Sequence, residues 1–119
     1  MLADACDHVN KVIVAVGYTD LRKGIDGLAQ IVGARYHMNP FEKDILFLFC
    51  GKRCDRIKGL LWEGDGYLLL YKRLEAGAFT WPRSPEDAAE ITSDQYHLLM
   101  KGFNPLQHKI NTVSPGSVI

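Results

Sequence analysis

"DRIKGLLWEGDGYLLLYKRL", residues 55–74, consists of two apolar runs separated by Glu-Gly-Asp-Gly. Glycine and aspartate are typical of the tight turn between two antiparallel strands. A two-residue turn pairs Trp62 with Tyr67 next to the turn, and Arg56 with Arg73 at the open end. The stretch therefore predicts a β-hairpin with a defined register.

A third strand is expected immediately before this hairpin. The run "DILFLFC", residues 44–50, is followed by Gly-Lys-Arg-Cys, which also suits a short hairpin loop. A two-residue loop there pairs Phe47 with Lys58 and Phe49 with Arg56. We therefore predict a three-stranded antiparallel meander.

This register gives the meander two unlike faces. The aliphatic face has a gap at Gly59, and we expect a helix to pack on it. The other face interleaves aromatic and cationic side chains, which either bind nucleic acid or lie under a second helix with their charged ends at the rim. The aliphatic face comprises Leu46, Leu48, Ile57, Leu61, Leu68, Leu70 and Leu74. The aromatic-cationic face comprises Phe47, Phe49, Arg56, Lys58, Trp62, Tyr67, Tyr71 and Arg73.

The N-terminal part of the chain predicts a strand followed by a helix. "KVIVAVG", residues 11–17, is rich in β-branched residues, and Thr19 or Asp20 is a suitable N-cap for a helix. Gly24 and Gly27 fall on one flank of that helix, and we expect them to let its backbone approach a sheet or another chain closely. The predicted apolar face carries Leu21, Ile25, Leu28, Val32 and Tyr36, and the opposite face carries Arg22, Lys23, Asp26 and Gln30.

A short helix is predicted near the C-terminus. Thr92 and Gln95 form a capping-box pattern, Ile91 and Tyr96 can form a hydrophobic staple, and Gly102 ends the helix. The predicted fold is therefore a single α+β domain over residues 11–102: the meander and the N-terminal strand, one packed helix and this short helix. Residues 1–10 are a leader, and residues 103–119 are a loose tail.

Composition limits the classes of function. The 119 residues carry 14 basic and 14 acidic side chains, so attraction to nucleic acid requires local clustering of charge. Such clustering occurs between residues 52 and 73. Three cysteines argue for a reducing compartment. Because neither a signal peptide nor an apolar run of membrane-spanning length is present, we predict a cytoplasmic protein without a membrane partner.

Metal binding and catalysis have little support in the sequence. Cys6, His8, Cys50 and Cys54 could form a zinc site, but the first two lie in an unpatterned leader and the spacing is unusual. No pair of carboxylates has a spacing that defines a catalytic role. We therefore expect no metal, no cofactor and no enzymatic activity, with a metal-dependent enzyme as the weakest alternative.

Four motifs resemble a known family: "TDLRKGIDGL", "NPF", "DRIKGLLWEGDGYLLLYKRLEAGAFTWP" and "ITSDQYHLLMKG". Over residues 12–102 the chain is similar to the TnpB-type accessory protein encoded by the second reading frame of bacterial insertion sequences of the IS-sixty-six type. Cys50 and Cys54 depart from the family's usual hairpin tip. The resemblance implies a role in transposition beside a large transposase and a small helix-turn-helix protein, and it implies no catalytic residues.

Two functions remain open from the sequence. The first is binding of DNA, such as transposon ends, or assembly of the transposase complex. The second is a protein–protein adaptor or self-associating module without DNA binding, which includes a homo-oligomer. The residues expected to bind nucleic acid are Arg22, Lys23, Lys52, Arg53, Arg56, Lys58, Trp62, Tyr71, Lys72 and Arg73.

Overall fold

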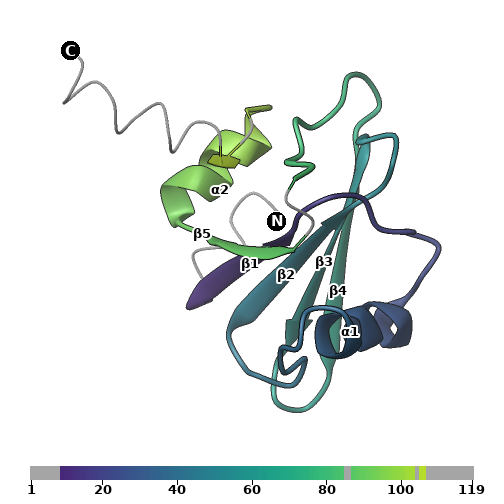
Figure 1. The fold of residues 1–119 in the computed structure, drawn as a ribbon, viewed down its shortest axis with the longest axis vertical. Helices are drawn as coiled ribbons and strands as arrows, with labels where there is room; N and C mark the ends of the chain where they lie inside the picture. Colours follow the sequence, from purple (N-terminus) through teal and green to yellow (C-terminus); the bar gives the residue numbers. More distant parts are fainter. Residues whose placement is uncertain (1–8, 85–86, 104, 107–119) are drawn as a thin grey trace.

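A five-stranded mixed sheet forms the centre of the molecule, as seen in a computed structural model that describes residues 9–84, 87–103 and 105–106 (Figure 1). Across the sheet, the strands follow the order β4-β3-β2-β1-β5. The elements in chain order are β1 (Lys11–Ala15), α1 (Ile25–Ala34), β2 (Ile45–Cys50), β3 (Arg56–Trp62), β4 (Tyr67–Arg73), β5 (Ala88–Ile91) and α2 (Ser93–Met100). The α+β class and the meander of β2, β3 and β4 are confirmed.

The hairpin of β3 and β4 has the predicted register. Trp62 lies opposite Tyr67, and Arg56 lies opposite Arg73. The Glu63 N–H donates a 2.9 Å hydrogen bond to the Gly66 carbonyl, so the turn itself contains two residues. Gly64 has a φ of 97°, a conformation that glycine adopts without steric cost.

The predicted register between β2 and β3 was wrong by two residues. Phe47 lies opposite Leu60, and Phe49 lies opposite Lys58. The connection is longer than a two-residue loop, because it contains a separate turn in which the Cys54 N–H donates to the Gly51 carbonyl at 3.0 Å. A shift of two residues leaves every side chain on its predicted face, since side chains alternate with a period of two.

The two pairings of β1 make the sheet mixed. β1 runs parallel to β2 and antiparallel to β5, a strand that was not predicted from the sequence. β5 is a four-residue edge strand, too short to show a clear alternation of apolar and polar residues. Its register places Val12 opposite Ile91.

The helix α1 begins later than predicted. Its first residue is Ile25, so Leu21, Arg22 and Lys23 lie in the preceding loop. The Asp20 carboxylate does not cap the helix, because it accepts the backbone N–H of Arg22 at 3.0 Å within a tight turn. Arg22 and Lys23 are therefore exposed loop residues and do not lie on a helix face.

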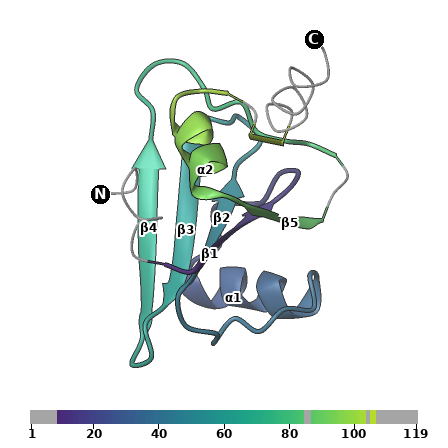
Figure 2. The same cartoon turned by 90° about the vertical axis from the view of Figure 1, so that its left-hand side faces the viewer.

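The prediction of which face α1 covers was also wrong. Leu28 and Val32 of α1 pack on the aromatic-cationic face, against Phe47 and Phe49, while α2 covers the aliphatic face. Figure 2 shows α1 running across the direction of β3 and β4. A strand–helix–strand crossover between parallel neighbours is almost always right-handed, so topology decides which face the helix covers.

The two glycines of the first helix do not serve close packing against the sheet. A Cβ atom at Gly24 would meet nothing within 4 Å, and one at Gly27 would meet only the side chain of Lys23. Close packing instead occurs at Gly59 of β3, where a Cβ atom would lie 3.1 Å from Leu46 Cδ1 and 3.4 Å from Leu48 Cδ2. These two leucines fill the predicted gap in the aliphatic face.

The capping of α2 is confirmed. Thr92 Oγ1 accepts the Gln95 N–H at 3.1 Å, and Gln95 Oε1 accepts the Thr92 N–H at 2.7 Å. Gly102, with a φ of 101°, follows the helix. Most of the predicted leader and tail lie outside the described residues. Neither described helix combines the length and apolar character that crossing a membrane requires.

Candidate nucleic-acid interface

A groove lies where the parallel strands β1 and β2 both end. Because the carboxyl ends of parallel neighbours meet at one edge, the loop of residues 16–24 and the loop of residues 51–55 lie side by side there. The Thr19 N–H donates a 2.8 Å hydrogen bond to the Cys50 carbonyl and joins the two loops. The groove has a volume of about 730 Å³. It is lined by Tyr18, Thr19, Asp20, Leu21, Arg22, Gly51, Lys52, Arg53, Asp55, Arg56, Lys58, Leu69 and Tyr71.

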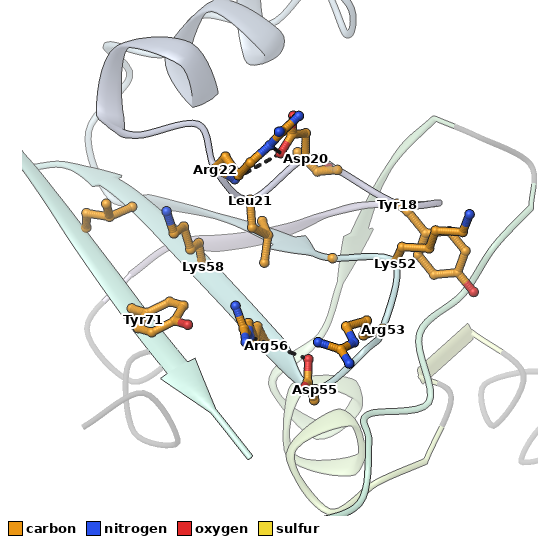
Figure 3. Close-up of a pocket in the computed structure, with 13 residues that line it drawn as sticks. Tyr18, Asp20, Leu21, Arg22, Lys52, Arg53, Asp55, Arg56, Lys58 and Tyr71 are labelled. Carbon is orange, nitrogen blue, oxygen red and sulfur yellow. Dashed lines mark hydrogen bonds and ion pairs between the residues drawn. The ribbon is translucent and has the colours of Figure 1, made fainter. Parts of the chain in front are cut away.

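Positive charge predominates in this groove (Figure 3). Its lining contains five cationic side chains and two carboxylates, which gives a net charge of +3. The carboxylates belong to Asp20 and Asp55. Lys52 and Arg53 form no ion pair within the part of the chain that the structure describes. The groove therefore attracts anions without a matching internal counter-charge.

Asp20 and Arg22 form a rigid turn on one wall. Arg22 Nε and Nη2 donate to Asp20 Oδ1 and Oδ2 at 3.0 and 2.8 Å, a bidentate arrangement that fixes the guanidinium. These hydrogen bonds hold the pKa of the Asp20 carboxyl well below its usual range. The Arg22 side chain is 91% exposed, so it stands at the rim with its charge largely balanced.

Arg56 is only loosely paired at the opposite wall. Its Nε lies 3.7 Å from Asp55 Oδ1 and is buried without a hydrogen-bond acceptor. Directly across the hairpin lies Arg73, and like charges in opposite positions destabilise a sheet. Glu75 relieves part of this repulsion, because its carboxylate lies 3.0 Å from Arg73 Nε.

Lys58 connects the hairpin to the loop before α1. Its Nζ donates a 3.0 Å hydrogen bond to the Lys23 carbonyl and lies 5.8 Å from the ring centre of Tyr71. The Tyr71 ring is directly opposite Lys58 on the edge strand β4. Together these contacts place an ammonium group and an exposed aromatic ring side by side in the groove.

The structure brings together six of the ten residues predicted to bind nucleic acid: Arg22, Lys52, Arg53, Arg56, Lys58 and Tyr71. Arg73 and Lys23 adjoin the groove without lining it. Lys72 lies opposite Ile57, on the aliphatic face. Trp62 lies at the turn end of the hairpin and packs against Phe41 and Tyr67 with ring centres 5.1 and 4.9 Å apart.

The residues that complete the groove between its cationic side chains were not predicted from the sequence to belong to a binding site. Leu21 was predicted on a helix face, and neither Leu69 nor Tyr18 was predicted to have a role. Leu21 Cδ1 lies within 3.3 Å of the position that a Cβ atom at Gly51 would occupy, so a side chain at Gly51 would crowd the junction of the two loops. Tyr18 and Leu21 closely follow the carboxyl end of a buried strand, and ligand sites are common at that end of a sheet. Their position in the chain could therefore have identified them.

The cysteines near the groove do not form a metal site with other described residues. The structured parts of the chain contain no group of three His, Cys, Asp or Glu side chains able to hold a metal ion. Cys50 is fully buried, and burial together with the neighbouring Cys54 raises the pKa of its thiol. Cys6 and His8, the other two candidate zinc ligands, lie outside the described residues.

Residues 10–109 match the model of the IS66 Orf2 like protein family. An uncharacterized protein of Sinorhizobium fredii, y4jC, is 35% identical over 94 residues, which cover 79% of this chain and 80% of that protein. A second uncharacterized protein of the same organism, y4hO, is 33% identical over 108 residues, covering 91% and 92% of the two chains. No solved structure matches the chain significantly. The chain therefore belongs to the family of IS66 Orf2-like proteins, and this membership implies an accessory role in transposition.

Proposed function

We propose that this protein is a non-enzymatic accessory factor of transposition that binds DNA through the groove at the ends of β1 and β2. One observation carries the proposal: five cationic side chains from three separate segments converge on one groove that contains two carboxylates. A protein neutralises DNA phosphates with lysine and arginine side chains, and this electrostatic contribution supplies most sequence-independent affinity.

The three segments suit phosphate binding in different ways. Arg22 is fixed by Asp20 at the rim, whereas Lys52 and Arg53 lie exposed on the neighbouring loop without an ion pair among the described residues. Arg56 and Lys58 project from β3, the strand next to the edge strand β4. Binding of an anion would relieve the repulsion between Arg56 and Arg73, which supports a role for the anion at that wall.

A salt series with transposon-end DNA tests this function. The Lys52→Ala, Arg53→Ala double variant should weaken binding at low salt and lower the slope of log affinity against log salt by about 0.7 to 0.9 for each phosphate that is no longer neutralised. The matched control removes two cations outside the groove, by Lys72→Ala with Lys101→Ala, and should keep the wild-type slope. Equal slopes for both double variants would contradict DNA binding in the groove.

A second candidate is a protein–protein adaptor for the transposase, for the small helix-turn-helix protein or for another copy of this chain. The supporting observation is the aromatic cluster of Phe41, Trp62 and Tyr67 at the turn end of the hairpin, in which Phe41 is 57% exposed. Aromatic residues are enriched at the centres of protein interfaces. If Phe41→Ser abolishes association with the transposase while DNA binding is absent in every variant, the adaptor function is correct.

A further inference from the structure

The groove combines positive charge with apolar and aromatic surface. Tyr71 is 52% exposed, and Leu21 and Leu69 are half-buried residues that also line the groove. Phosphates alone would not need these three side chains. Their presence indicates that the ligand has a flat or apolar group in addition to its anionic groups.

A DNA duplex does not match this combination. Its bases are stacked inside, and its outer surface presents phosphates and sugars to a protein that follows the backbone. A single strand exposes the faces of its bases, which stack on aromatic side chains while the phosphates contact cations in the same groove. Among the forms of DNA, a single strand or an unpaired nucleotide therefore offers Tyr71 a base face on which to stack.

The size of the groove also favours a single strand over a duplex as the ligand. A volume of about 730 Å³ lies within the range of roughly 300 to 1,000 Å³ typical of sites for small organic ligands. A space of this size can accommodate a nucleotide, whereas a duplex is too wide to enter it. The open side is bordered by the edge strand β4, from which a single strand can enter and leave.

The neighbours of Tyr71 prepare it for stacking. Lys58 Nζ lies 5.8 Å from the ring centre, near the outer limit of a cation–π contact, and is hydrogen-bonded to the Lys23 carbonyl. The ammonium group is thereby held over one face of the ring, where it can contact the phosphate of a nucleotide whose base stacks on the other face of Tyr71.

We propose that the groove holds unpaired nucleotides of single-stranded DNA, with a base stacked on Tyr71 and the adjoining phosphates contacted by Lys52, Arg53 and Arg56. This inference rests on the proposed function, because it assigns the form of DNA that the same groove binds. A transposition factor with this preference would act where the strands of a transposon end are separated.

A comparison of three labelled probes tests the inference: a twelve-nucleotide oligothymidylate, an abasic strand of the same length, and a duplex containing the same number of phosphates. Tyr71→Ala should bind the oligothymidylate about 5- to 140-fold more weakly than the wild type, because it removes one base stack. Binding of the abasic strand and of the duplex should change less than about twofold, because neither offers an accessible base. Tyr71→Phe keeps the ring and should retain the wild-type preference for the oligothymidylate over the abasic strand.

Several results would overturn the inference. If Tyr71→Ala retains the full preference for bases, or if the wild-type protein binds the duplex as tightly as the oligothymidylate, the groove does not select unpaired nucleotides. The proposed function would survive either result, provided that Lys52→Ala with Arg53→Ala still lowers the salt slope. If the wild-type protein binds none of the three probes, both the inference and the proposed function are wrong. Thermal melting of each variant confirms that it is folded.

Discussion

Lys58 Nζ lies 3.0 Å from the backbone carbonyl oxygen of Lys23 and donates a hydrogen bond to it. The two residues are 35 positions apart, and the bond joins β3 to the loop before α1. This contact holds the two walls of the groove together. The same ammonium group lies beside Tyr71, so one side chain supports both the loop and the proposed ligand site.

The Lys58→Met variant keeps most of the side-chain length and removes the charge and the donor. We expect it to lower the free energy of unfolding by about 1 kcal/mol, the net value of one hydrogen bond, as measured by urea denaturation. In a salt titration with DNA, the slope should fall by about 0.7 to 0.9. Lys58→Arg retains the charge and serves as the control. An unchanged slope for Lys58→Met would mean that Lys58 supports the loop without contacting DNA.

Gly59 lies at a position of the sheet where a side chain would be crowded. A Cβ atom there would lie 3.1 Å from Leu46 Cδ1, in a fully buried part of the aliphatic core. We expect Gly59→Ala to lower the free energy of unfolding by about 1–3 kcal/mol, the usual cost of overpacking. Gly66→Ala is the control, because nothing lies within 4 Å of its Cβ position. Equal stability of the two variants would show that Leu46 and Leu48 move aside freely.

Local signals in the sequence were sufficient to predict the hairpin. The turn residues Gly64 and Asp65 and the alternation of side chains on both strands fix the register from Arg56 to Arg73. The capping box of α2 could also be predicted, because Thr92 and Gln95 are three residues apart. Both features depend on residues that are close in the chain.

The remaining features depend on contacts between distant segments. The parallel pairing of β1 with β2, the addition of β5 and the face covered by α1 follow from topology, on which periodicity carries no information. The same limit applies to the groove. Arg56, Lys58 and Tyr71 could be placed together from strand alternation, but their approach to Leu21 and Tyr18 depends on the parallel pairing.

Trp62 and Tyr71 should respond differently to substitution, although the sequence placed them on one face. Trp62 is half-buried between Phe41 and Tyr67, outside the groove. We expect Trp62→Ala to lower the melting temperature, through the loss of roughly 1–3 kcal/mol of hydrophobic burial and aromatic contact, and to leave DNA affinity unchanged. A loss of DNA affinity in a folded Trp62→Ala protein would place the binding surface at the turn end of the hairpin.

The capping box of α2 should contribute measurably to stability. Thr92→Ala removes the acceptor for the Gln95 N–H, and we expect it to lower the free energy of unfolding by about 1 kcal/mol in chemical denaturation. Ser93→Ala, a change at the adjacent exposed residue, should stay within about 0.5 kcal/mol of the wild type. If Thr92→Ala is as stable as Ser93→Ala, the packing of Tyr96 and Leu99 alone holds the helix in place.

The ion pair of Asp20 and Arg22 should contribute to stability in a pH-dependent manner. Hydrogen bonds from Arg22 hold the pKa of the Asp20 carboxyl below its usual value of 3.8 in the folded protein. The unfolded chain therefore takes up a proton first as the pH falls, and the contribution is complete well above pH 3.8 and is lost progressively below it.

Melting temperatures of the wild type and of Asp20→Asn at about pH 7 and about pH 3 measure this effect. We expect Asp20→Asn to melt below the wild type at neutral pH and the difference to shrink at the acidic pH. Because both partners are exposed, the difference should also shrink in high salt. Arg22→Gln removes the same ion pair from the other side, and the double variant should add little to either single change. A difference that is equal at both pH values would show that Asp20 stabilises the turn through its shape and hydrogen bonding and not through its charge.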